Sequence, residues 1–132
     1  MRRRALAAVI LLVALAGCQS AGTGHSTPSQ KAATYVQIFK TVDYAYEEAL
    51  RAAGRAHAGG LLSDADMARV RQAGLAVEVA LRSTQAALET YLARGDDAAQ
   101  EALVVGALAE LQRTVAELMA ARSQPAAPGG TP

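Results

Sequence analysis

The chain has 132 residues, of which 13 are basic and 12 acidic, giving a formal charge of +1. Nucleic-acid-binding proteins carry a basic patch or stripe, so this balance argues against such a partner. Aromatic residues make up 4% of the chain and Trp is missing, which argues against a stacking platform for bases or sugars. The length accommodates one domain of ordinary size.

The N-terminal residues have the pattern of an export signal. Arg2, Arg3 and Arg4 precede an apolar run from Ala5 to Ala16. A membrane-spanning helix needs ~20 apolar residues, so this shorter run predicts a signal peptide rather than a permanent membrane helix.

The only cysteine stands where this apolar run gives way to polar sequence. Leu15-Ala16-Gly17-Cys18 resembles the lipobox of bacterial lipoproteins, in which a Leu, a small residue and Gly precede a Cys. The resemblance covers residues 1–18. An alternative is ordinary cleavage after Ala16, which would leave a free thiol. A lone cysteine in an exported chain cannot form an internal disulfide, and this favours the lipobox.

The lipobox resemblance implies cleavage between Gly17 and Cys18, with acyl chains attached to Cys18. Each buried methylene contributes about 0.8 kcal/mol, so two or three chains would hold the protein at the membrane. Gln19 follows the cysteine, and the resemblance then favours the outer membrane, with the protein facing the periplasm. Loss of residues 1–17 would leave 10 basic and 12 acidic residues, a formal charge of −2.

Residues 18–26 are expected to form the lipidated N-terminus and a flexible tether, since QSAGTGHS is rich in Gly, Ser and Thr. The eight residues after Cys18 reach at most ~28 Å. His25 lies in this tether, where we expect a solvated residue rather than a metal ligand.

A first helix is predicted over residues 28–58. Thr27 suits the N-cap, Pro28 the first helical position, and Gln30 completes a capping box. Gly59 and Gly60 end the helix, with His57 placed to complement its C-terminal dipole. Its apolar stripe comprises Tyr35, Ile38, Phe39, Val42, Ala45, Tyr46, Ala49, Ala53 and Ala56.

A second helix is predicted over residues 64–94. Ser63 is its N-cap, Asp64 and Asp66 lie in its first turn, and Gly95 ends it. Its core stripe comprises Met67, Val70, Gly74, Val77, Leu81, Thr84, Leu88 and Tyr91. Among these, Gly74 is expected to allow a close approach between helices.

A third helix is predicted over residues 97–122, with Asp97 as its cap and Gln100 closing a capping box. Its core stripe comprises Val104, Leu108, Leu111, Val115 and Leu118. Pro125 prevents continuation, and we expect residues 124–132 to be a disordered tail.

Three long helices with short connections predict an all-α fold, an antiparallel up-down-up three-helix bundle over residues 27–123. Helices of this length measure ~37–45 Å. Alanine-rich stripes let helix axes approach towards ~8 Å.

Two surface features are candidate interfaces. Tyr44 falls off the stripe of the first helix, beside Glu47 and Glu48, and could anchor a partner or be an ordinary surface aromatic residue. The two glutamates are adjacent and point in different directions, so we do not expect acid–base catalysis from them.

A second apolar strip on the second helix comprises Leu75, Val79, Ala86 and Leu92, interrupted by Arg82. A middle helix contacts two neighbours, so the strip could belong to a wide buried arc. Alternatively, it forms a surface for self-association or for another envelope protein.

No catalytic, phosphate-binding or metal-binding motif is present in the sequence. We therefore expect no cofactor, no metal and no enzymatic activity. The sequence favours a lipid-anchored envelope protein that serves as an interaction or structural module. Alternatives are a module that binds a small apolar ligand such as a lipid, or a phage-encoded lipoprotein acting in lysis or superinfection exclusion.

Overall fold

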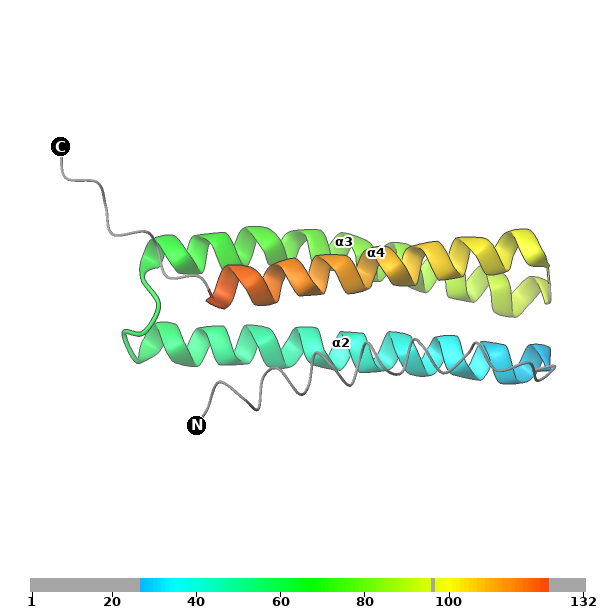
Figure 1. The fold of residues 1–132 in the computed structure, drawn as a ribbon, viewed down its shortest axis with the longest axis horizontal. Coiled ribbons are helices and arrows are strands. Elements are labelled where there is room, and N and C mark those ends of the chain that lie inside the picture. The colour runs from blue at the N-terminus through cyan, green and yellow to red at the C-terminus, as the bar shows by residue number, and fades with distance from the viewer. Residues whose placement is uncertain (1–26, 96, 124–132) are drawn as a thin grey trace.

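The computed structural model describes residues 27–95 and 97–123, and all regular structure within them is helical. Three helices follow one another: α2 (Pro28–Ala58), α3 (Asp64–Arg94) and α4 (Ala98–Ser123). Each helix runs antiparallel to the next in an elongated bundle (Figure 1). The predicted all-α three-helix bundle is confirmed, and each helix begins and ends within one residue of its predicted bounds.

The predicted signal peptide, tether and tail (1–17, 18–26 and 124–132) lie outside the described residues, and with them Gly17, Cys18 and His25. No helix in the described part of the chain combines the length and the apolar character needed to cross a bilayer.

Side chains close the N-termini of α2 and α3 as the sequence predicts. Thr27 accepts a hydrogen bond from the N–H of Gln30 (3.4 Å), and the Gln30 side chain accepts one from the N–H of Thr27 (2.9 Å). Ser63 Oγ accepts from the N–H of Asp66 (3.1 Å), while Asp66 Oδ2 accepts from the N–H and hydroxyl of Ser63. These reciprocal bonds satisfy amides that have no partner within the helix.

The connections between helices depend on glycines with positive φ. Gly60 (φ 71°) turns the chain after α2, and Gly95 (φ 79°) turns it after α3. The α2–α3 turn also contains a contact that the sequence did not predict. In it, His57 Nε2 lies 2.8 Å from Asp64 Oδ1. Asp97 Oδ1 accepts a hydrogen bond from the N–H of Ala99 (2.9 Å), which caps α4.

The core lies along the inner faces of the three helices. All five residues of the stripe predicted for α4 are buried: Val104, Leu108, Leu111, Val115 and Leu118. One cluster surrounds Leu111 and Leu118 towards the α2–α3 turn, and a second surrounds Leu88 and Leu108 towards the opposite end. Thr84, fully buried, lies at the level between the two clusters.

α3 and α4 make the most extensive contact in the bundle. Small residues allow this approach, since Thr84 Oγ1 lies 3.1 Å from the carbonyl oxygen of Ala107 across the two helices. Gly74 instead faces α2, where a Cβ would lie 3.7 Å from Leu50 Cδ2 and from Tyr46 Oη. This is ordinary van der Waals spacing, so Gly74 lies at a helix contact as predicted, but the contact does not require glycine.

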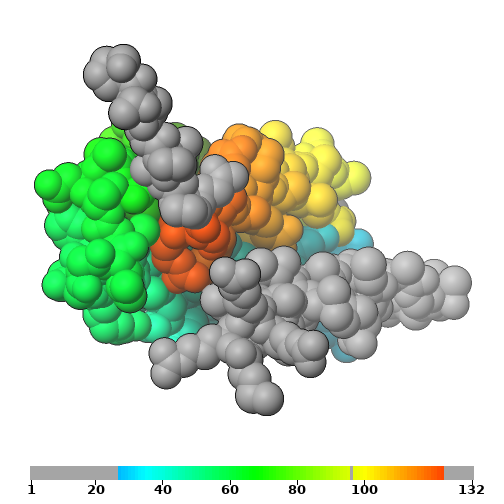
Figure 2. All heavy atoms as spheres, turned by 60° about the vertical axis from the view of Figure 1, so that its left-hand side comes forward, coloured from blue at the N-terminus to red at the C-terminus, as the bar shows by residue number. Residues whose placement is uncertain are grey.

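The two ends of the bundle carry different connections. The start of α2 and the α3–α4 connection share one end (Figure 1). The α2–α3 turn, in green, and the end of α4, in orange-red, share the other and come forward in Figure 2. Anything attached before residue 27 therefore joins the bundle at the end that holds the α3–α4 connection.

Candidate functional site

Tyr44, the first candidate interface residue, lies on the outer surface of α2 and is 64% exposed. Tyr46 is buried, and its hydroxyl donates to Glu78 on α3 (3.3 Å). Burial and the nearby Glu78 carboxylate raise the pKa of Tyr46. The prediction that the first of these tyrosines is exposed and the second is in the core is confirmed.

The carboxylates beside Tyr44 are ion-paired on the surface of α2. Arg51 bonds to Glu47 across one helical turn (2.8 Å) and also to Glu48. The hydrogen bond that Arg51 donates to Glu48 and the charges of both carboxylates raise the pKa of Arg51. Exposed pairs of this kind contribute 0 to about 1 kcal/mol to stability. Here both glutamates, Glu47 and Glu48, are paired with Arg51.

The apolar strip predicted on α3 lies on the surface of the bundle. Leu75, Val79 and Leu92 are 56%, 59% and 55% exposed, and Ala86 is exposed too. The interpretation of this strip as part of a wide buried arc is therefore wrong. The reason is geometric, because α2 contacts α3 through Gly74 and α4 contacts it through Thr84, which leaves the outer side of α3 uncovered.

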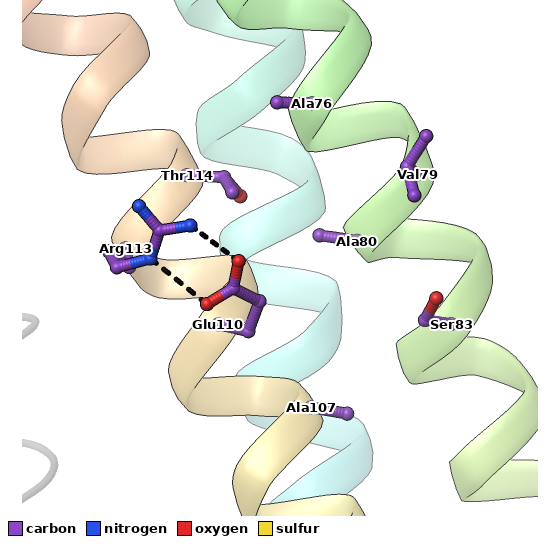
Figure 3. Close-up of a pocket in the computed structure, with 8 residues that line it drawn as sticks. All are labelled: Ala76, Val79, Ala80, Ser83, Ala107, Glu110, Arg113 and Thr114. Atoms are coloured by element: carbon purple, nitrogen blue, oxygen red, sulfur yellow. Dashed lines mark hydrogen bonds and ion pairs between the residues drawn. The ribbon is translucent and has the colours of Figure 1, made fainter.

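A groove of about 320 Å³ runs between α3 and α4 on their outer side (Figure 3). Val79 lines it from α3, and the close-up shows Ala76 and Ala80 beside it, with α2 passing behind. α4 contributes four lining residues: Ala107, Glu110, Arg113 and Thr114. The structure therefore brings Val79 together with residues of α4, whereas Tyr44 lies on a different helix.

One edge of this groove carries three alternating charges on α4. Arg113 bonds to Glu110 through Nε (2.9 Å) and also pairs with Glu117 one turn further on. The hydrogen bonds from Arg113 hold the pKa of Glu110 below its usual range, and those carboxylates raise the pKa of Arg113. Each charged group on this edge already has a partner, so covering the edge would leave no charge unpaired.

A polar cluster joins α2 to α4 near the end that holds the first residue of α2. Tyr35 Oη donates to Glu101 (2.7 Å), and Lys31 Nζ donates to the other oxygen of the same carboxylate (3.1 Å). These bonds hold the pKa of Glu101 below its usual range. The Tyr35 ring also packs edge-on against Tyr91 of α3, with centroids 5.8 Å apart. The cluster therefore ties all three helices together where the chain enters the bundle.

Sequence reasoning missed the half of the groove that α4 supplies. A signal was present, because α4 has only a weakly amphipathic pattern and carries exposed Leu103 and Val105 outside its core stripe. Apolar residues outside the core stripe of a helix indicate a second contact surface. Among residues 27–95 and 97–123, no three His, Cys, Asp or Glu side chains are grouped to hold a metal ion.

The chain has no significant match to a protein-family model, to a curated protein or to a solved structure.

Proposed function

We propose that this chain is a lipid-anchored protein of the cell envelope, and that its helical bundle serves as a non-enzymatic interaction module. The observation that carries the proposal is the lipobox-like Leu15-Ala16-Gly17-Cys18 at the end of an apolar run. Acyl chains on Cys18 anchor the protein, and Gln19 directs it to the outer membrane, facing the periplasm.

The position of the first helix supports this arrangement. α2 begins at Pro28, so only residues 19–27 separate the anchor from the bundle. The bundle then stands with its α3–α4 connection towards the bilayer and its α2–α3 turn away from it. α2 has 31 residues, and at 1.5 Å per residue it extends about 46 Å from the tether.

An interaction role is supported by what the bundle exposes. Large apolar side chains lie on the outer side of α3, and a groove bordered by internally paired charges runs beside them. Helix faces of this kind bind partner helices. Arg51 engages Glu47 and Glu48 of α2, and Arg113 engages Glu110 and Glu117 of α4. This arrangement suits a solvated or covered surface rather than proton transfer.

Metabolic labelling tests the anchor. Cells expressing the full chain, a Cys18→Ser variant and a matched Ser20→Ala control are grown with radiolabelled palmitate. We expect label and membrane association for the parent and the control, and the loss of both for Cys18→Ser. If Cys18→Ser stays in the membrane fraction and the parent takes up no label, the proposal is wrong.

The interaction role is tested separately by crosslinking in intact cells, followed by purification of the tagged full chain. We expect a reproducible crosslinked species that contains a protein partner or a second copy. A tagged chain that is recovered only as an uncrosslinked monomer, across crosslinkers of several lengths, contradicts it.

A further inference from the structure

α2 is the least deeply buried of the three helices. Its buried residues are Val42, Tyr46, Ala49 and Ala53, and two of these four are alanine. α3 has the same length of 31 residues but buries eight of them, and α4 buries six of 26. Tertiary packing supplies most of the stability of a helix in a protein, so α2 receives less of this stabilisation than its neighbours.

The tightest part of the core belongs to α3 and α4, with α2 set along one side of the pair (Figure 1). The large apolar side chains that α2 contributes, such as Ile38, Phe39 and Leu50, are only partly buried. Among the described residues, the largest side chains that are fully buried all come from the other two helices: Val70, Val77 and Thr84 of α3, and Val104, Leu111 and Leu118 of α4. Separating α2 therefore disrupts less of the close packing than separating α3 from α4.

The polar contacts of α2 with its neighbours involve groups that water also reaches. Tyr35 and Lys31 donate hydrogen bonds to Glu101 of α4 (2.7 and 3.1 Å). Tyr46 donates to Glu78 of α3 (3.3 Å). The Glu101 and Glu78 side chains are 23% and 50% exposed. Because such hydrogen bonds are exchanged for bonds to water when the helices part, their net contribution to stability is modest.

The first half of α2 also has a sequence that favours the helix less than those of its neighbours. Residues 34–42, TYVQIFKTV, are mostly β-branched or aromatic. Such side chains lose rotamer freedom in a helix. α4 is built instead mainly from Ala, Leu, Glu and Gln, which rank among the best helix formers. α2 therefore depends more on packing for its stability, although it is the helix that packs least.

We infer that α2 is a detachable helix, which separates from α3 and α4 in a partial opening of the bundle while those two helices stay paired. Proteins open in cooperative units of unequal stability, and a unit with few buried apolar contacts opens most readily. The contact of Thr84 with Ala107 joins only α3 and α4, so it persists in the open form. Because most helical stability comes from packing, α2 unfolds when it separates.

The opening changes the surface that the chain presents. The core cluster around Leu111 and Leu118 includes Val42 and Ala49 of α2, so it becomes accessible when α2 leaves. The position of α2 thus decides whether the apolar inner side of α3 and α4 is covered. This opening is a property of the three helices, and it does not require acyl chains on Cys18.

Hydrogen–deuterium exchange of the full-length protein, followed by mass spectrometry, tests the partial opening. The segments to compare are the central, buried parts of the helices: residues 42–53 of α2, 77–84 of α3 and 104–111 of α4. We expect protection factors in the α2 segment that are about tenfold lower than those in the other two. Equal protection in all three helices, or the strongest protection in α2, overturns the inference.

Thr84→Val provides a sharper test, because it removes a contact that the partial opening keeps. Protection in α3 and α4 is expected to fall about fivefold, the effect of one hydrogen bond, while protection in α2 stays as in the parent. If the bundle opens only as a whole, protection falls equally in all three helices, and that result contradicts a detachable α2. If Thr84→Val changes no segment, the comparison within the parent chain decides alone.

Tyr35→Phe is the matched control, because it removes the hydrogen bond to Glu101 and keeps the ring against Tyr91. This bond is broken both when α2 separates and when the whole bundle unfolds. Protection is therefore expected to fall by a similar factor in all three helices, and circular dichroism checks that both variants keep their helices. A fall confined to α3 and α4 would contradict the separation of α2.

Discussion

The hydroxyl of Thr84 on α3 lies 3.1 Å from the carbonyl oxygen of Ala107 on α4, and 2.7 Å from the carbonyl of Ala80 within its own helix. Thr84 is fully buried between the two core clusters. This contact joins α3 to α4 at one defined height along the bundle. The side chain at this position therefore contributes to the closest packing in the bundle, that of α3 against α4.

Thr84→Val is expected to lower the free energy of unfolding by about 1 kcal/mol, the usual net value of a hydrogen bond. For a domain of this size that corresponds to a fall of about 4–8 °C in melting temperature. Thermal unfolding followed by circular dichroism measures it. Thr41→Val is the matched control, since exposed Thr41 makes the same bond to its own helix but none to a neighbour. Equal effects at both positions would show that the contact between helices contributes nothing.

Gly74→Ala is expected to stabilise the bundle by about 1 kcal/mol, because alanine is the better helix former by that amount. The added methyl would lie 3.7 Å from Leu50 and Tyr46, without overlap. Gly54→Ala is the control, since a Cβ at Gly54 meets nothing within 4 Å. A rise in melting temperature at Gly54 together with a fall at Gly74 would mean that α2 and α3 pack more closely than described.

Ser63→Ala is expected to cost about 1 kcal/mol, the typical loss for an N-cap. It removes both the acceptor for the Asp66 amide and the donor to the Asp66 carboxylate. The same substitution at exposed Ser83, in the middle of α3, is expected to leave the melting temperature unchanged or slightly raised. Similar losses at both serines would contradict the cap.

Stability is expected to fall as the pH is lowered below about 4, the ordinary range of these carboxyl groups. Hydrogen bonds from Ser63 and Arg69 lower the pKa of Asp66, and those from Tyr35 and Lys31 lower the pKa of Glu101. A lowered pKa in the folded state stabilises the fold above the ordinary pKa, and this stabilisation is lost as protonation proceeds.

Melting temperatures at pH 6 and pH 3 measure this dependence. The decrease in melting temperature from pH 6 to pH 3 should be smaller in an Asp66→Asn, Glu101→Gln variant than in the parent. The variant itself is expected to be less stable than the parent at pH 6. Glu89→Gln, a substitution on the exposed side of α3, should leave the fall unchanged. An undiminished fall in the double variant would assign the acid sensitivity to other groups.

The sequence predicted the helices well because their signals are local. Thr27 with Gln30, Ser63 with Asp66, and the glycines at 60 and 95 define the ends of elements without reference to the rest of the chain. The apolar spacing of α4 similarly identified Leu111 and Leu118 as core residues. Capping and periodicity depend only on neighbours in the sequence, and a single sequence records them directly.

The exposed face could not be predicted in the same way. Whether Leu75 and Val79 are buried depends on which side of α3 each neighbour covers, and this is decided by the contacts at Gly74 and Thr84. The contact of Thr84 with Ala107 depends on the height of one helix against another. Such relationships join residues far apart in the chain, and helical periodicity carries no information about them.

The lipid anchor is the central claim, and the intact mass of the full-length gene product, extracted from membranes, tests it most directly. We predict that the mature chain begins at Cys18 and carries the added mass of a diacylglyceryl group, with a further acyl chain where the amine is modified. A mass corresponding to a chain that retains residues 1–17, or to one cleaved after Ala16 with an unmodified thiol, would contradict the claim.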